Sequence, residues 1–284
     1  RVTAITPAMI SGSCMNNMFA KYPKRCFDVG IAEDHAITFA CGMALEGLRP
    51  FVSVYSSFLQ RAYDQLNHDV CRMNLPVVIG VDRCSIIGED GDSHQGVFDI
   101  SYMNSLPNMV IAEGKNSSQI EALLDLAFSQ TSPFAIRYPR GSIEYNCDQK
   151  CDVSLGKWEF VVNNIDSKVS IITYGNDVCK IEKDINDNHL PYNLINALFI
   201  KPIDEELLVS VARLNKPIVV YTNDIIKGGL GDSILECLNK NHINAPVYIL
   251  GVDDIYVKHG SVLKVKERLG LDLNSLYHFI ESIC

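Results

Sequence analysis

The sequence predicts an α/β protein of two domains, each a three-layer α/β/α unit built on a mostly parallel sheet. Three observations support this prediction. Short β-branched and apolar runs alternate with helical runs along nearly the whole chain. A polar stretch without a clear period, residues 142–156, interrupts the alternation once. The 284 residues, of which 47% are hydrophobic, are enough to bury two cores.

The first half of the chain predicts five strands, at residues 2–6, 25–31, 51–55, 77–82 and 134–138. The run 77–82 is too apolar for a half-exposed strand and is typical of a buried parallel one. Helices are predicted at 34–45 and 58–73, and a third follows a capping box formed by Ser118 and Glu121. The helix 34–45 is apolar on nearly all sides, so we expect it to be buried. Residues 85–99, rich in Gly, Asp and His, predict a loop.

The second half resumes the same alternation. Strands are predicted at 168–174, 193–199, 217–222 and 246–250, and helices at 177–186, 204–214, 228–241 and towards Cys284. The Gly228–Gly231 turn suits either a phosphate cradle or close packing, and the lack of a P-loop Lys-Ser/Thr pair favours packing. We place the first domain at residues 1–145, the linker at 146–156 and the second domain at 157–284.

The composition excludes several classes of protein. A formal net charge of −9 argues against a nucleic-acid partner, which needs a basic face. We expect no membrane association, because no apolar run is long enough to span a bilayer, and no secretory signal opens the chain. The ten cysteines form no CxxC pair, so we expect reduced thiols in a cytosol-like compartment and no metal site. The chain begins at Arg1, directly in a predicted strand, and we expect it to be part of a longer polypeptide.

Reactive side chains follow four predicted strands of the first domain. The stretches are Gly30–His35, which contains Glu33, then Tyr55–Arg61, Asp82–Gly96 and Arg137–Gly141. Because the carboxyl ends of parallel strands meet at one edge of a sheet, we expect these stretches to lie close together. Arginines that converge from separate loops suit a phosphate, and a histidine can transfer protons near neutral pH.

Each of these residues also has a structural interpretation. Glu33 suits the N-terminus of the helix that follows it, where the helix dipole favours a carboxylate. Core packing, ion pairing or solvation would account for the other residues when each is considered alone: Tyr55, Phe58, Arg61, Arg83, His94 and Arg137. The recurrence of such residues at four strand ends of one domain favours a shared site.

Four motifs closely resemble one family, the 1-deoxy-D-xylulose-5-phosphate synthases of the transketolase-like, thiamine diphosphate-dependent group. They are, in order, DVGIAEDHA, YSSFLQRAYDQL, VDRCSIIGEDGDSHQGVFD and RYPRG. The resemblance is dense from Ile5 to Gly141 and thinner beyond the linker, where Lys168–Gly175, Gly228–Gly231 and His259–Ser261 still look like the family. It implies a pyrimidine-binding domain with the thiamin-diphosphate-binding fold, followed by a transketolase-type C-terminal domain.

The resemblance implies roles for the matching positions around the cofactor. Glu33 matches the glutamate that hydrogen-bonds ring nitrogen N1′ of the aminopyrimidine. Phe58 matches the aromatic residue that packs on this ring, and Tyr55 lies beside it. Glu33 and His94 are the implied catalytic residues.

Substrate contacts are implied in the same way. Arg61 and Arg140 match the arginines that bind the phosphate of glyceraldehyde 3-phosphate, and Arg140 is preferred to Arg137 for this role. Further positions match residues around the acceptor and the pyruvate-derived adduct: His35, Tyr55, Arg83, Asp90 and His94. The family usually has other residues where Asp34, Cys84, Ser85, Asp92 and Ser93 stand, and Asp92 adds a negative charge near the anionic substrates.

The implied reaction joins pyruvate to glyceraldehyde 3-phosphate, giving CO₂ and 1-deoxy-D-xylulose 5-phosphate for isoprenoid, thiamine and pyridoxal synthesis. The family's GDG…N motif, which binds the cofactor diphosphate through Mg²⁺, is absent from this sequence. We therefore expect an N-terminal diphosphate-binding domain or fragment as a partner, a homodimer, and a cytoplasmic or plastid-type location. The alternatives are a subunit of a split transketolase, a 2-oxo acid dehydrogenase beta subunit, or a non-catalytic remnant.

Overall fold

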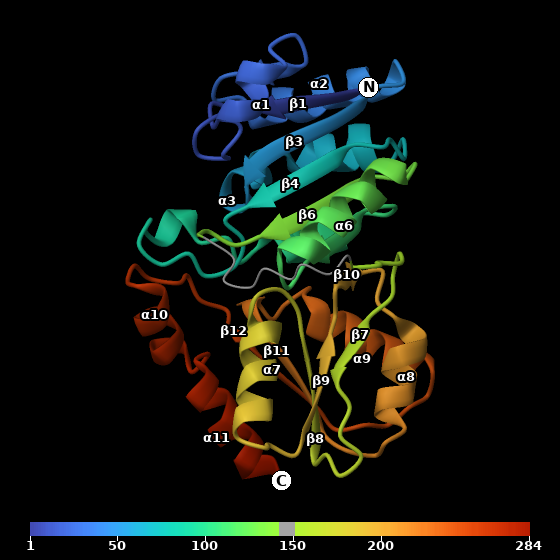
Figure 1. Cartoon of the computed structure of the whole chain (residues 1–284), viewed down its shortest axis with the longest axis vertical. Helices are drawn as coiled ribbons and strands as arrows, with labels where there is room; N and C mark the ends of the chain where they lie inside the picture. The colour runs from blue at the N-terminus through green and yellow to red at the C-terminus, as the bar shows by residue number, and fades with distance from the viewer. Residues whose placement is uncertain (142–150) are drawn as a thin grey trace.

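Two mostly parallel sheets lie one above the other along the long axis of the molecule (Figure 1). This computed structural model describes residues 1–141 and 151–284, so the first part of the predicted linker, 146–150, lies outside the described residues. The first sheet has the strand order β10-β5-β6-β4-β3-β1-β2, and the second has the order β12-β11-β8-β9-β7. The predicted α/β fold with two sheets is therefore confirmed.

The first sheet aligns the ends of its central strands. Its parallel strands are β1 (Val2–Thr6), β2 (Cys26–Asp28), β3 (Arg49–Tyr55), β4 (Val78–Asp82), β5 (Val110–Glu113) and β6 (Phe134–Tyr138). The register pairs Tyr55 with Asp82, and Asp82 with Tyr138. The loops that follow these three strands consequently start in one row at the same edge of the sheet.

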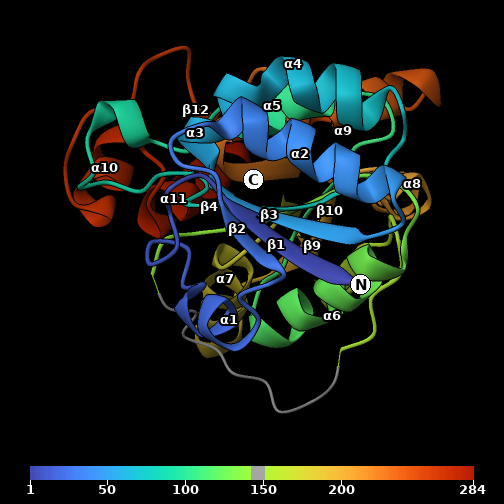
Figure 2. The same ribbon diagram turned by 90° about the horizontal axis from the view of Figure 1, so that it is seen from above.

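Helices cover both faces of the first sheet (Figure 2). On one face lie α2 (Glu33–Leu45), α3 (Ser56–Leu59), α4 (Tyr63–Gln65) and α5 (Asp99–Asn104), and on the other lie α1 (Asn16–Lys21) and α6 (Ser117–Ser129). The helix α2 packs on the sheet through Ala36, Ile37 and Ala40. The expectation that α2 is buried all round is wrong, because its opposite side is in solvent and Leu45 is 61% exposed.

The predicted helix 58–73 is confirmed as far as Cys71, but it is not regular: α3 is followed by a 3₁₀ turn at Gln60–Ala62, by α4, and by a π-helical turn at Leu66–Cys71. With this succession of 3₁₀ and π-helical turns, Leu59 and Leu66 are both fully buried. The predicted capping box is wrong. Ser118 does not cap α6, because the Asn116 side chain does so by accepting a hydrogen bond from the Gln119 backbone N–H at 3.0 Å.

The second sheet has its own two helical layers. Its strands are β7 (Glu159–Val162), β8 (Val169–Thr173), β9 (Tyr192–Asn196), β11 (Ile218–Ile225) and β12 (Val247–Val252). One face packs against α7 (Asp177–Asp187), α10 (Val262–Leu269) and α11 (Leu273–Ile283), and the other against α8 (Glu205–Ala212) and α9 (Leu230–Lys240). Successive residues of β8 face opposite sides of the sheet. Ile171 packs in the core on the side of α7, and Ile172 packs in the core on the side of α8 and α9.

One strand ties the two sheets together. The predicted strand 193–199 is wrong as a single element: β9 ends at Asn196, and β10 (Phe199–Lys201) pairs antiparallel with β5 at the edge of the first sheet. The Phe199 carbonyl also accepts a hydrogen bond from the Trp158 indole at 2.7 Å. Residues 197–200, at the crossing, are all apolar, so the apolar pattern does not mark the change of sheet.

The Gly228–Gly231 turn packs closely, as predicted. A Cβ atom at Gly231 would lie 2.6 Å from Ile249 Cδ1, and one at Gly228 would lie 3.3 Å from the Ser101 Cα of the first domain. The Gly228 carbonyl accepts a hydrogen bond from Asn104 Nδ2 at 3.0 Å. The turn therefore serves as a contact between the domains.

Three features hold within residues 1–141 and 151–284. Seven cysteines within these ranges are free thiols: Cys14, Cys26, Cys41, Cys71, Cys84, Cys237 and Cys284. No three His, Cys, Asp or Glu side chains in the same ranges are grouped so that they could hold a metal ion. No helix within them has the length and apolar character needed to cross a bilayer.

Candidate functional site

The predicted site residues gather where the strand order of the first sheet reverses. β2 lies beside β1 on one side and β3 lies beside it on the other, so the strands that follow β1 are placed on opposite sides of it. Ligands of open α/β sheets bind in the crevice at such a point, outside the carboxyl ends of the strands. The loop after β1 contributes Gly12, whose carbonyl accepts a hydrogen bond from Arg83 at 3.3 Å.

Glu33 begins α2 and is buried, with 5% of its side chain exposed. Its Oε1 atom lies 2.8 Å from Nη1 of Arg61, a side chain that is 55% exposed. In the part of the chain that the structure describes, Arg61 is the hydrogen-bond partner of this carboxylate, and Oε2 has none. The Arg61 guanidinium also lies over the Phe58 ring, 5.2 Å from its centroid. One arginine therefore joins the buried acid to the aromatic side chain.

An aromatic cluster forms the centre of the site. The Tyr55 and Phe58 rings stack with their centroids 5.3 Å apart. The His94 ring meets Phe58 edge-on at 5.3 Å, and its Nδ1 atom lies 2.9 Å from Ser93 Oγ. Burial raises the pKa of the Tyr55 hydroxyl, which therefore stays protonated at neutral pH. The half-buried Phe58 ring is therefore contacted by Tyr55 from the end of β3 and by His94 from the loop after β4.

Asp90 connects two arginines at the outer end of the cluster. Its Oδ1 atom lies 2.7 Å from Arg140 Nη1, and its Oδ2 atom lies 3.9 Å from Arg83 Nε. The Arg83 guanidinium rests on the Tyr55 ring at 3.8 Å from the centroid and contacts Asp82 at 3.0 Å. The cationic groups of this site are consequently neutralised by side chains of the chain itself.

The loop that carries Arg83 has a strained backbone. Arg83 and Ser85 adopt φ angles of 56° and 64°, which are unusual for residues other than glycine. A bridge between Ser85 and Gly96 closes the loop. A Cβ atom at Gly96 would lie 2.1 Å from the Arg83 carbonyl oxygen, so only glycine fits there. This closure fixes the positions of Arg83 and His94 relative to each other.

The second domain contacts the loop that carries His94. A Cβ atom at Gly88 would lie 2.7 Å from the Gly260 carbonyl oxygen. The Asp92 carboxylate lies 3.4 Å from the Lys258 ammonium, and both side chains are more than half exposed. The extra negative charge of Asp92 is therefore balanced by the second domain and faces solvent.

His35 is the one predicted site residue that lies apart. It is exposed on α2, and its ring stacks on Phe39 with centroids 5.8 Å apart. Among the described residues it has no ring contact or hydrogen bond with the cluster formed by Glu33, Tyr55, Phe58, Arg61, Arg83, Asp90, His94 and Arg140. Its place is two residues beyond Glu33, on the outer side of the same helix.

Arg137 belongs to a different set of charges, which the sequence did not predict. It is fully buried, and its guanidinium pairs with Asp99 at 2.6 Å, with Asp224 of the second domain at 2.8 Å, and with Glu113. Burial, opposed by Arg137, raises the pKa of Glu113 to about 7. Arg137 faces into the protein near the end of β6, whereas Arg140 lies in the exposed loop that follows the strand.

Comparison with known proteins agrees with this architecture. The family model "Transketolase, pyrimidine binding domain" matches residues 1–145, and "Transketolase, C-terminal domain" matches residues 156–276. The chain belongs to the transketolase family. Within this transketolase-type arrangement, β10 lies in the second matched segment but completes the sheet of the first.

Relatives of this transketolase-family chain carry a more specific name. A protein of Clostridium tetani named 1-deoxy-D-xylulose-5-phosphate synthase is 45% identical over 275 residues, which cover 96% of this chain and 44% of that protein. One of Listeria monocytogenes with the same name is 42% identical, covering 97% and 46%. The chain thus spans less than half the length of these curated relatives.

Solved structures show the same fold. One titled "Split gene transketolase, inactive beta4 tetramer" matches with a TM-score of 0.87 and 26% identity, covering 99% of this chain and 91% of that chain. A transketolase from Campylobacter jejuni matches with a TM-score of 0.77 and 17% identity, covering 99% and 43%. The second likeness bears on the fold alone.

Proposed function

We propose that this chain supplies the pyrimidine-binding and C-terminal domains of a 1-deoxy-D-xylulose-5-phosphate synthase. The enzyme would condense pyruvate with D-glyceraldehyde 3-phosphate, releasing CO₂, as a step towards isoprenoid precursors. The observation that carries the proposal is the single cluster in which Glu33, Phe58, His94 and three arginines meet. The relatives with 41–45% identity bear the name of this enzyme, which supports the same reaction.

The residues of the cluster fit the pyrimidine end of thiamine diphosphate. When bound, this cofactor supplies the electron sink for breaking the bond to the pyruvate carboxylate. Glu33, whose side chain is 5% exposed, offers its Oε2 acceptor, which has no partner among the described residues, to a ring nitrogen that bears a proton. Phe58 offers a half-buried ring face beside it, with Tyr55 stacked behind. The carboxylate would hold the proton, and the aromatic pair would orient the ring.

The arginines would bind the phosphate of the acceptor. Arg61 and Arg140 are the more exposed cations of the cluster, with side chains 55% and 43% exposed. Guanidinium forks match phosphate oxygens bidentately, so an incoming phosphate would compete with Asp90 for Arg140. Arg83 stacks on the Tyr55 ring and would line the base of the site between Arg61 and Arg140.

His94 is proposed as the proton-transfer residue of this chain. Its Nδ1 atom is engaged by Ser93, which leaves Nε2 as the atom able to exchange a proton with a substrate oxygen. Asp90 would bind the hydroxyl groups of the acceptor once Arg140 turns to the phosphate. His35 would line the entrance, because it is exposed on the outer side of α2.

The diphosphate end of the cofactor needs a partner. We propose an N-terminal diphosphate-binding domain or fragment that holds Mg²⁺, and assembly as a homodimer. Two findings support the N-terminal partner: the chain spans less than half of its curated relatives, and the described residues contain no group of three metal ligands.

A second candidate is the C-terminal subunit of a split transketolase. The observation in its favour is the solved chain titled "Split gene transketolase", of which this chain covers 91%. That enzyme class takes its two-carbon unit from a ketose phosphate rather than from pyruvate. The 2-oxo acid dehydrogenase beta subunit and the non-catalytic remnant are the other outcomes to be distinguished.

Reconstitution tests the proposal. The chain is mixed with the N-terminal part of the same polypeptide, thiamine diphosphate and Mg²⁺, and CO₂ release and sugar phosphate formation are measured. We expect turnover of pyruvate with glyceraldehyde 3-phosphate in the mixture and none with the chain alone. Turnover by the chain alone, turnover of xylulose 5-phosphate in place of pyruvate, or an inactive mixture in which both parts are folded and associated would overturn it.

A further inference from the structure

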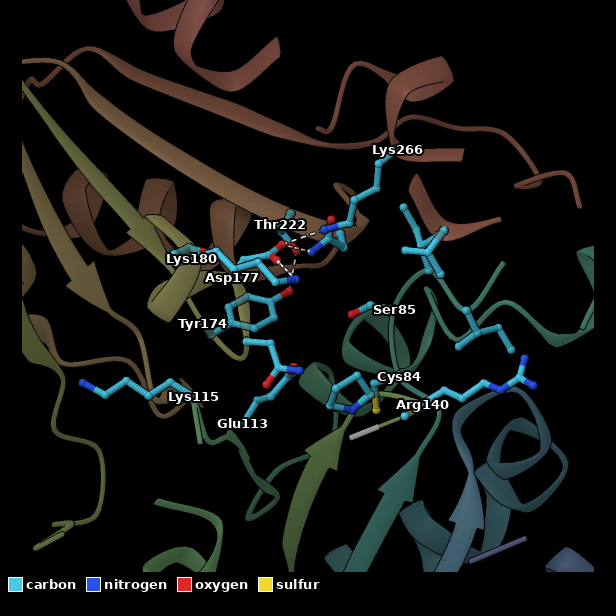
Figure 3. Close-up of a pocket in the computed structure, with 18 of the residues that line it drawn as sticks. Cys84, Ser85, Glu113, Lys115, Arg140, Tyr174, Asp177, Lys180, Thr222 and Lys266 are labelled. Atoms are coloured by element: carbon cyan, nitrogen blue, oxygen red, sulfur yellow. Dashed lines mark hydrogen bonds and ion pairs between the residues drawn. The ribbon is translucent and has the colours of Figure 1, made fainter. Parts of the chain in front are cut away.

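A cavity lies between the two domains. Its volume is about 430 Å³, within the range of ligand pockets, which is roughly 300–1,000 Å³. The first domain lines it with segments that follow β4, β5 and β6, and the second lines it with the ends of β8 and β11 and with α10. Figure 3 shows Tyr174, Asp177 and Lys180 on one side of the opening and Ser85 and Cys84 across from them.

The cavity occupies the point where the strand order of the second sheet reverses. From β8 the chain continues to β9 on one side, and β11 and β12 lie on the other side. The ends of β8 and β11 meet at the cavity through Thr173, Tyr174, Thr222 and Asn223. This is the position at which open α/β sheets bind ligands. In the first sheet, the cluster around Glu33 lies at the point where the strand order reverses. The cavity lies at the corresponding point of the second sheet.

The wall of the cavity has acceptor oxygens without donors. Asn176 Oδ1 and Asn223 Oδ1 are buried and have no hydrogen-bond partner. Leaving a buried polar atom unpaired is unfavourable, so such atoms usually have a partner in the functional state. Hydroxyl groups of a ligand are suitable donors for both.

The same wall carries two ammonium groups beside one carboxylate, and the carboxyl groups of Glu89 and Glu113 also line the cavity. The buried Asp177 carboxylate, at the start of α7, is 3.1 Å from Lys180 and 2.8 Å from Lys266. Asn223 Nδ2 also donates to it, at 2.6 Å. Two ammonium groups thus share one carboxylate. The Lys180 side chain is 46% exposed, so it is free to turn from Asp177 towards an anion in the cavity.

This cavity is separate from the proposed catalytic cluster. Figure 3 shows the Arg140 side chain pointing away from Asp177 and Lys180. Its guanidinium binds Asp90 in the other site, while the residue itself contributes to the cavity lining. Arg140 and the strained Ser85 therefore stand between the two sites.

We propose that the interdomain cavity binds a small hydroxylated anion, with the acid group at Lys180 and the hydroxyl groups at Asn176 and Asn223. A sugar phosphate and a sugar acid share this chemistry. The inference goes beyond the proposed function, because it concerns a different site and does not depend on the reaction.

Calorimetric titration of the full chain tests the proposal with two probes, ribose 5-phosphate and gluconate. Ribose and inorganic phosphate are the controls that lack the acid group or the hydroxyl groups. We expect at least one acid probe to bind at millimolar concentrations or below, more tightly than either control. If neither probe binds, or if ribose or phosphate binds as well as the acids, the proposal is wrong.

Variants then locate the binding. Asn176→Leu removes an oxygen that makes no hydrogen bond, so the fold should be at least as stable, whereas binding should weaken about tenfold or more. Lys180→Gln should weaken binding similarly, and Lys183→Gln, on the exposed side of the same helix, should not. Arg61→Met, in the other site, should leave it unchanged. Binding that survives Asn176→Leu and Lys180→Gln, or that is lost in Arg61→Met, contradicts the assignment.

Discussion

The Arg61 guanidinium lies 2.8 Å from the Glu33 carboxylate, so one ion pair joins the proposed cofactor acid to the proposed phosphate ligand. The carboxylate is buried and the arginine is largely exposed. Arg61 is consequently able to turn to a substrate only by leaving Glu33, or by holding both at once. Changes at either residue should therefore affect both parts of the site.

Glu33→Gln should nearly abolish activity of the reconstituted enzyme. The amide keeps the shape of the side chain but cannot hold the proton that the carboxylate holds, and such steps are worth about 10²–10⁴ in rate. Steady-state kcat is the measurement. Circular dichroism should show an intact fold, and activity close to that of the wild type would remove Glu33 from the proposed role.

Arg61→Met and Arg140→Met should both raise the KM for glyceraldehyde 3-phosphate. They should differ in their other effects, because only Arg61 contacts Glu33. Arg61→Met should also lower kcat, whereas Arg140→Met should mainly affect KM. Initial rates with each substrate varied in turn separate the two parameters. A selective defect in the KM for pyruvate in both variants would argue against phosphate binding by these arginines.

Arg137→Met should strongly destabilise the fold. The change leaves Asp99, Glu113 and Asp224 buried without their shared cation, which typically costs about 3–5 kcal/mol. Urea denaturation measures the free energy of unfolding. The matched control is Arg140→Met, whose exposed pair with Asp90 contributes less than about 1 kcal/mol. Equal stabilities of the two variants would contradict the buried network.

Glu113 should make stability depend on pH between about 4.5 and 7. Its pKa is raised from 4.5 to about 7 in the folded state, chiefly by burial. Below this window both states hold the proton. As the pH rises through it, the unfolded chain releases the proton first, so unfolding becomes easier by roughly 3 kcal/mol in total.

Glu113→Gln should remove this part of the pH dependence. Relative to the wild type, the variant should gain stability as the pH rises from 5 to 8, within the window set by the Glu113 pKa of about 7. Urea denaturation at several pH values gives the two curves. Parallel curves would show that Glu113 does not titrate in this range.

Asp92→Ala should have little effect on stability. The Asp92–Lys258 pair is 3.4 Å long and solvent-exposed, and such pairs are worth less than about 1 kcal/mol. A double-mutant cycle with Lys258→Ala measures the coupling. A coupling well above this value would show that the pair does hold the His94 loop in place.

The candidate site was largely predictable because its residues lie in four short segments. Each segment follows a strand of strong pattern, and parallel strands bring their carboxyl ends to one edge. Tyr55, Phe58, Arg61, Arg83, Asp90, His94 and Arg140 consequently meet as expected. His35 is the exception, because helical geometry turns it to the outer side of α2. A position two residues from Glu33 does not share its direction.

The sequence by itself determined the two parallel domains and the residue types at the strand ends, because both depend on local periodicity and short motifs. Only the tertiary structure decided which charges are buried together. Arg137 and Asp224 are 87 residues apart, and no local pattern relates them. The transfer of β10 to the other sheet and the cavity at the ends of β8 and β11 arise in the same way. Each depends on contacts between distant segments, which exist only once the two sheets have packed against each other.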